Sequence, residues 1–169
     1  MRHVALTLVA PVRPDAREGL QAALDALPSG PASPLAGIPG LHLGRIAVVD
    51  ALRGPQGEPM PGVGPLLMVS LDADGPLDAV LAALAIHCGE LLRACEGCPD
   101  PADGPSFAAW ARAHRLKDRW TIMPYAGRTL PEVRSALRTR ERLGAFAGAV
   151  ADADPATLRA RFLEQFGDA

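Results

Sequence analysis

The stretch HCGELLRACEGCP, residues 87–99, places one histidine and all three cysteines of this chain close together. Such residues can bind a metal or form a redox pair. On a helix, however, Cys88 and Cys95 lie about 10.5 Å apart along the axis, too far for one metal with bonds of about 2.3 Å. Cys95 and Cys98 form a CxxC pair at a helix end, where the dipole disfavours a thiolate. We therefore expect core and cap cysteines there.

His87 lies on the stripe of this predicted helix that also carries Leu84 and Cys88. A histidine facing a sheet either lies in the core, bonded to a carbonyl group, or is an axial ligand of haem. The core is favoured because buried polar groups usually find partners. Haem binding through His87, His42 or His114 stays open as an alternative.

His42 and Arg45 are the more informative pair, because they interrupt the apolar strand LHLGRIAVVD, residues 41–50. Their opposite parity sends the two side chains to different faces of a sheet. An arginine on such a strand needs an anionic partner, either a carboxylate such as Asp72 or a ligand. We expect His42 to be a general base and Arg45 to position an anion, as the candidate catalytic pair.

The other strands also divide into two faces. One face is purely aliphatic and is expected to meet helices: Val4, Leu6, Leu8, Leu67, Val69 and Leu71. The opposite face is smaller and mixed, yet too apolar for bulk water, so either the C-terminal helices or a second copy of the protein covers it. We predict that this second face is a ligand pocket lined by Thr7, Met68 and Ser70, with Trp120 and Tyr125 from a fourth strand.

The elements that must position these residues follow the order βαββαβ. Strands are predicted at 3–10, 41–50, 65–74 and 119–127, and helices at 15–27 and 77–95. This order is typical of an α+β, ferredoxin-like antiparallel sheet, here with appended C-terminal helices. Pro124 suits the fourth strand only at a sheet edge. Asp15, Ser106 and Asp154, the last of which directly precedes Pro155, are expected to cap helices.

We therefore expect a ferredoxin-like domain over residues 1–127 and a C-terminal helical extension, residues 128–169, packing on that domain. Between the second and third strands, residues 51–64 contain four glycines and three prolines. A connection of this length is either a lid over the pocket, with Met60 as a contact, or a mobile surface loop.

Composition excludes several classes of protein. The chain has 169 residues, 49% of them hydrophobic, with 17 basic and 19 acidic residues. This balance is typical of a soluble globular domain and gives no basic surplus for nucleic acid. No apolar run approaches the roughly 20 residues that cross a bilayer, and three cysteines make no disulfide framework. The short N-terminal apolar run lacks a cleavage site, so a cytoplasmic protein is expected.

The segments LHLGRIAVVD and PLLMVSLDADGPLD, followed by a long helix, resemble subunits of the dimeric α/β-barrel superfamily. That superfamily includes antibiotic-biosynthesis-monooxygenase and EthD types and the haem-binding chlorite-dismutase and dye-decolorizing-peroxidase relatives. The resemblance covers residues 3–127 and implies a homodimer with a small organic molecule or haem over the sheet.

The expected function is binding of a small hydrophobic or anionic organic molecule, in a metal-free oxygenase- or isomerase-like enzyme of secondary metabolism. A non-catalytic interaction or accessory protein and a haem-binding peroxidase-like protein are the alternatives. No nucleic acid, membrane or resident cofactor is expected as a partner.

Overall fold

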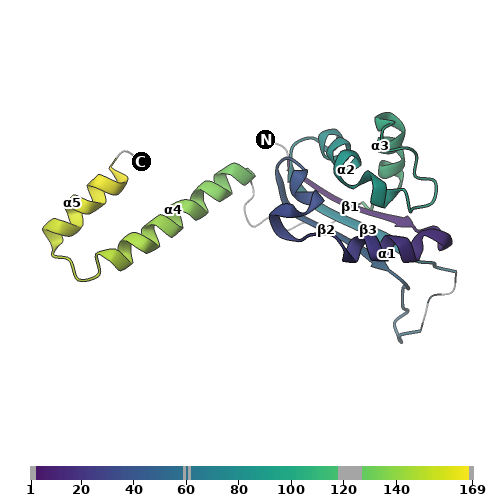
Figure 1. Ribbon diagram of the computed structural model, residues 1–169, viewed down its shortest axis with the longest axis horizontal. Coiled ribbons are helices and arrows are strands. Elements are labelled where there is room, and N and C mark those ends of the chain that lie inside the picture. Colours follow the sequence, from purple (N-terminus) through teal and green to yellow (C-terminus); the bar gives the residue numbers. More distant parts are fainter. Residues whose placement is uncertain (1–2, 59, 61, 118–126, 168–169) are drawn as a thin grey trace. The chain divides into compact units, whose positions relative to one another are not determined.

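The computed structural model describes residues 3–58, 60, 62–117 and 127–167 (Figure 1). Its strands and helices, with the short 3-10 turns marked η, follow one another as β1 (His3–Pro11), η1 (Pro14–Ala16), α1 (Arg17–Asp25), η2 (Gly30–Ala32), η3 (Pro34–Gly37), β2 (Leu41–Val49), β3 (Leu66–Asp74), α2 (Leu77–Leu92), α3 (Gly104–Ala113), α4 (Leu130–Ala149) and α5 (Pro155–Phe166). The protein is therefore a mixed α+β chain.

The described strands form an antiparallel sheet in the order β1-β3-β2. Alternation along β1 and β3 buries one face, as predicted: Val4, Leu6, Leu8, Leu67, Val69 and Leu71 are at most 7% exposed. The second face consists of the even-numbered residues of β3 and their register partners, and it is half-buried along β1 and β3. The sequence thus predicted correctly which side of the sheet carries the core.

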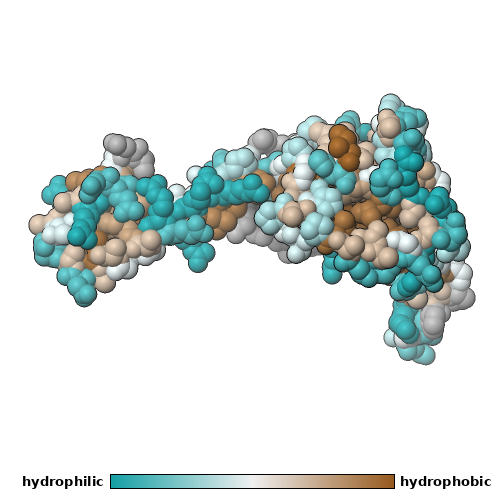
Figure 2. Space-filling model, viewed as in Figure 1, coloured by the Kyte–Doolittle hydropathy of each residue, from teal (hydrophilic) through white to brown (hydrophobic). Residues whose placement is uncertain are grey.

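Helices α1, α2 and α3 complete this core. Leu20 of α1, Leu84 of α2 and Phe107 of α3 belong to one buried cluster with the aliphatic sheet face. Apolar residues gather toward the middle of the first unit on the side that Figure 2 shows, with hydrophilic residues around its rim. Burying such a stripe is what stabilises short helices of this kind.

Two predicted helix caps are wrong. Asp15 lies inside η1, and α1 begins only at Arg17 without a side-chain cap, because Pro14 starts a 3-10 turn first. At α3 the capping residue is Asp103, whose side chain accepts a hydrogen bond from the Ser106 backbone N–H. Ser106 lies one turn inside the helix instead. An aspartate three residues before a backbone N–H is an equally good cap.

The predicted fourth strand, including Pro124, falls on residues 119–126, which lie outside the described residues. Just before it, the chain pairs with the edge of β1. The Val9 N–H donates to the His114 carbonyl at 3.0 Å, and the Leu116 N–H donates to the Thr7 carbonyl at 2.8 Å. Arg115 forms an antiparallel bridge with Leu8.

The chain divides into two compact units, Met1–Leu130 and Pro131–Ala169. In the second unit the rings of Phe146, Phe162 and Phe166 pack together, with centroids 5.1–5.8 Å apart. The Asp154 side chain caps α5, as predicted from its place before Pro155. Packing of the C-terminal helices on the first domain stays a prediction.

Among the helices that the structure describes, none combines the length and the apolar character needed to cross a membrane.

Candidate functional site

A β-bulge near the start of β2 decides where His42 points. Leu41 pairs with Ala73 and Leu43 with Asp72, so His42 is an extra residue between two consecutive partners. The bulge places His42 on the second face of the sheet, beside His3. The prediction that His42 and Arg45 lie on opposite faces is therefore wrong, because strict alternation does not hold across a bulge.

Gly40 permits the close approach at this bulge. Its φ of +70° is in the left-handed region, which glycine adopts most readily. A Cβ at this position would come within 2.9 Å of the Asp74 Cβ. The Gly40 carbonyl accepts a hydrogen bond from the Asp74 N–H at 3.0 Å. A glycine is thus needed where β2 approaches the end of β3.

Three strand ends meet here and form what we call the histidine corner, consisting of His3, His42, Asp72 and Asp74. His3 begins β1 and is the register partner of Asp74, the last residue of β3. The Nε2 atom of His42 lies 3.0 Å from Oδ1 of Asp74, and Nδ1 of His3 lies 3.8 Å from the same oxygen. His3 Nε2 contacts the Asp72 carboxylate.

The corner is shielded but reachable from solvent. The side chains of Asp74, His42 and His3 are 10%, 15% and 19% exposed. Burial acts to raise the pKa of Asp74, but the hydrogen bonds from His42 and the Leu130 N–H outweigh it and hold the pKa below its usual value. The Leu130 N–H donates to Oδ2 at 2.7 Å. Asp74 is therefore a carboxylate at neutral pH, with Oδ1 directed to the histidines.

A second polar row crosses the same face. Thr7 and Arg45 are both register partners of Ser70, so these three side chains lie side by side across β1, β3 and β2. Arg45 is exposed, and its side chain makes no hydrogen bond or ion pair with any described residue. The suggested carboxylate partner Asp72 instead contacts His3.

Beyond this row the face becomes apolar. Met68 lies in register with Val9 and Ala47, further from the corner. The structure therefore brings Thr7, Met68 and Ser70 onto one face, in successive rows. Trp120 and Tyr125, the other predicted lining residues, lie outside the described residues.

His87 is neither in the core nor on the side of α2 that faces the sheet. It is exposed, and its ring lies against Gly37 of η3, where any side chain would collide with it. The predicted stripe was too wide, because Leu84 and Cys88 are buried whereas His87 is exposed. The His114 ring packs against Trp110 at a tilt of 40°, with ring centroids 4.7 Å apart, and its Nδ1 contacts the Trp110 carbonyl.

The cysteines behave as core residues. Cys88 and Cys95 are buried, as predicted, and Cys98 is half-buried. Burial raises the pKa of Cys88 to about 11 and that of Cys95 to about 12. Thiols with such pKa values are poor nucleophiles at neutral pH.

The long connection after β2 leaves the sheet at the end opposite the histidine corner (Figure 1). It is held by its own backbone hydrogen bonds, from Met60 to Leu52 and from Gly54 to Glu58, each 2.8 Å long. Met60 is thus a residue of the far end of the sheet rather than a neighbour of His42.

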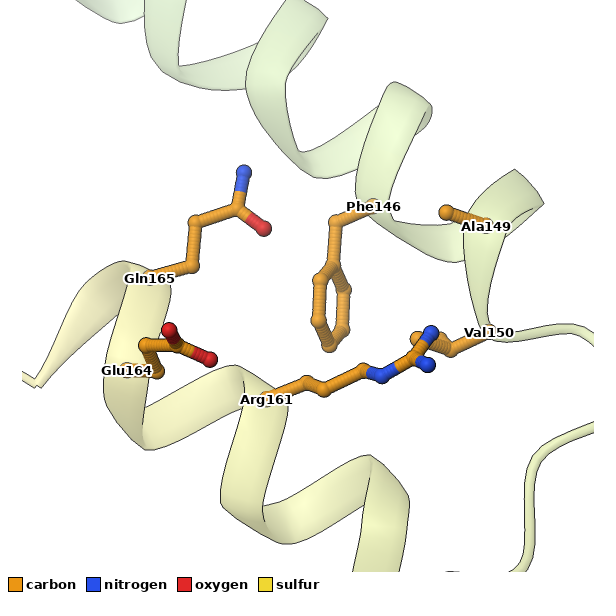
Figure 3. A pocket seen from close by; sticks show the side chains of 6 residues that line it. All are labelled: Phe146, Ala149, Val150, Arg161, Glu164 and Gln165. Atoms are coloured by element: carbon orange, nitrogen blue, oxygen red, sulfur yellow. The ribbon is translucent and has the colours of Figure 1, made fainter.

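A hollow of about 420 Å³ lies between α4 and α5 in the second unit. In Figure 3 the Phe146 ring points from α4 toward α5, and Arg161, Glu164 and Gln165 reach from α5. Its lining holds no histidine or cysteine. Among the described residues of this unit only Val150 is buried, so the walls are weakly supported. The histidine corner is the better candidate site.

Sequence reasoning missed His3 and Asp74 as site residues. A usable signal was present, because in the predicted antiparallel order the starts of the first two strands and the end of the third lie at the same end of the sheet. HVAL, LHLG and DADG each bring a polar residue to that end.

Comparison of this chain with known protein families, curated proteins and solved structures gave no match.

Proposed function

We propose that this chain binds a small anionic organic molecule on the second face of the sheet and acts on it with the histidine corner. The observation that carries the proposal is that His42, held by Asp74, shares this face with the row Thr7–Ser70–Arg45. One end of the face thus offers a proton acceptor, and the middle offers Arg45, a cation whose side chain has no partner among the described residues. Met68 adds an apolar surface beyond.

The spacing limits the size of the ligand. Ser70 and Asp74 are four residues apart on β3, a separation of about 13 Å. A flexible arginine covers roughly half of that distance. A molecule that carries a carboxylate or phosphate several bonds away from its reacting carbon fits both groups.

The chemistry can be carried by side chains alone. A carboxylate only accepts hydrogen bonds, so the proton between His42 and Asp74 belongs to His42 Nε2. In the neutral form of this ring, Nδ1 is then the nitrogen that accepts a proton. A histidine oriented in this way is a general base that removes a proton from a bound molecule. This supports a metal-free isomerase- or oxygenase-like reaction.

The proposed architecture is a ferredoxin-like domain that pairs with a second copy in the cytoplasm. The order β1-β3-β2 supports this topology, and so does the start of pairing between Arg115 and Leu8 on the outer edge of β1. Leu43 on the second face is 69% exposed, which supports a covering partner.

A binding screen tests the proposal. Small carboxylates and phosphate esters of increasing apolar length are titrated into the ¹⁵N-labelled chain, and amide shifts are followed by NMR. We expect shifts in residues 3–9, 41–47 and 68–74, and a loss of affinity of about tenfold or more in Arg45→Gln, since a charge-assisted contact contributes about 1.5–3 kcal/mol.

Arg53→Gln is the matched control, because Arg53 lies in the connection at the opposite end of the sheet, where it bonds the Gly57 carbonyl. Binding that Arg53→Gln weakens as much as Arg45→Gln contradicts the proposed site. A chain that binds none of these compounds favours the accessory-protein alternative.

A further inference from the structure

We propose that the histidine corner is also a binding site for one divalent transition metal ion, ligated by His3 Nδ1, His42 Nε2 and Asp74 Oδ1. The inference rests on the proposed function only for the location of the site. It goes further by giving these side chains a metal of the zinc or iron(II) class, so the metal-free chemistry proposed above applies to the chain without that ion.

The donor types match this class of ion. Two imidazoles and one carboxylate are the ligands that zinc uses in catalytic sites and that non-haem iron(II) uses in a facial triad. Softer copper(I) sites need thiolate or thioether ligands, and calcium sites need mainly oxygen. The cysteines that could have supplied sulfur lie on α2 and just after it, within or beside the core.

The distances match as well. One donor atom from each of His3, His42 and Asp74 can be chosen so that all three lie within 4.8 Å of one another. The pairs to Oδ1 of Asp74 are 3.0 Å and 3.8 Å apart. Ligands about 2.05 Å from a tetrahedral zinc ion are separated by about 3.3 Å, so small side-chain movements bring both nitrogens to that spacing.

The groups behind the ligands hold them in the orientation that a metal needs. The far nitrogen of His3, Nε2, contacts Asp72, which leaves Nδ1 directed toward Asp74. The far oxygen of Asp74, Oδ2, is occupied by the Leu130 N–H, which leaves Oδ1 for the ion. A carboxylate behind a ligating histidine is the usual second partner at zinc sites, where it fixes the ring and raises its basicity.

A metal ion would take the place of the proton that His42 and Asp74 share. Three protein ligands leave at least one coordination position for water or for an oxygen atom of the bound molecule. The ligands come from three neighbouring strands, a rigid support for such a site.

The test uses the full-length chain, freed of metal with a chelator, and Zn²⁺ alone as the probe. We expect isothermal titration calorimetry to show one Zn²⁺ per chain, and Co²⁺ to give a visible absorption spectrum that Zn²⁺ abolishes. His3→Ala, His42→Ala and Asp74→Asn should each remove the binding. Asp72→Asn should weaken it by about 10- to 100-fold.

Matched controls separate this site from other donors. His87→Ala and Cys98→Ser remove an exposed histidine and the most accessible thiol and should leave Zn²⁺ affinity unchanged. Circular dichroism checks that each variant folds, and His42→Gln serves if an alanine variant does not. Wild-type protein that binds no Zn²⁺, or binding that survives His42→Gln but not Cys98→Ser, overturns the proposal.

Arg45→Gln distinguishes failure of this inference from failure of the proposed function. It should weaken anion binding by about tenfold or more and leave the Zn²⁺ titration unchanged. Loss of Zn²⁺ binding in Arg45→Gln contradicts the assigned ligands, whereas a chain that binds anions but no metal overturns the metal site alone.

Discussion

His42 and Asp74 face each other at 3.0 Å although they are not register partners in the sheet. The bulge after Leu41 turns His42 onto the second face, and β3 ends at Asp74 directly opposite. A histidine on one strand and a carboxylate on the next are thereby held by backbone pairing rather than by a loop.

Asp74 should make stability depend on pH. Its pKa is lowered in the folded chain, so its contribution is present above the unfolded-state pKa near 3.8 and is lost as pH falls through the folded value. The free energy of unfolding, measured in urea, should therefore fall more steeply below about pH 4 in the wild type than in Asp74→Asn. At pH 7 the variant should be less stable by about 1–3 kcal/mol, because two hydrogen bonds to the carboxylate are changed. Identical pH profiles for the two proteins contradict this role.

Gly40→Ala should disturb the corner. The new methyl group would meet the Asp74 Cβ at 2.9 Å. The substitution would also force an alanine to adopt a φ of +70°. Gly57→Ala is the matched control, because its φ of +86° carries a comparable strain but nothing lies within 4 Å of its Cβ. We expect about 1–2 kcal/mol of destabilisation from strain in both, and a further loss only in Gly40→Ala. The expectation is contradicted if the NMR shifts of His3 and His42 change in Gly57→Ala but not in Gly40→Ala.

Light scattering tests the proposed pairing of two chains. We expect a mass of about twice the 17.6 kDa of one chain at micromolar concentration. Leu43→Glu should shift this to one chain, because it places a charge on the second face where a partner would cover Leu43. Ile86→Glu is the control, since Ile86 is 79% exposed but lies on α2, which covers the other face. A wild-type protein with the mass of one chain contradicts the proposed dimer.

Shortening the connection between β2 and β3 tests whether it is a lid. Replacing residues 53–62 by a Gly-Asn turn should leave ligand affinity within about twofold, because the connection leaves the sheet at the end far from His42. The thermal midpoint should also change little, since Leu52 and Met60 are exposed. Lost ligand binding in a folded variant would instead assign the connection to the site.

Local patterning was sufficient to predict the buried sheet face of the first unit and the start of a helix in the second. Alternation along HVALTLVA and LLMVSLDA identified the buried sheet face, because every second side chain of a strand lies on the same face and the aliphatic ones are buried together. Asp154 before Pro155 correctly predicted the start of α5, since a cap acts within a single turn.

Contacts between distant strands decided the rest. No periodicity within β2 reveals the bulge at His42, because it depends on how Leu41 and Leu43 pair with β3. His3, near the start of the sequence, becomes a candidate site residue only because its register partner is Asp74, 71 positions later. The expected pairing of Arg45 with Asp72 is absent for the same reason, because Asp72 contacts His3 of β1. Residue types and strand order are local properties of the sequence, whereas the joining of four side chains in one corner depends on register, which only the packed sheet determines.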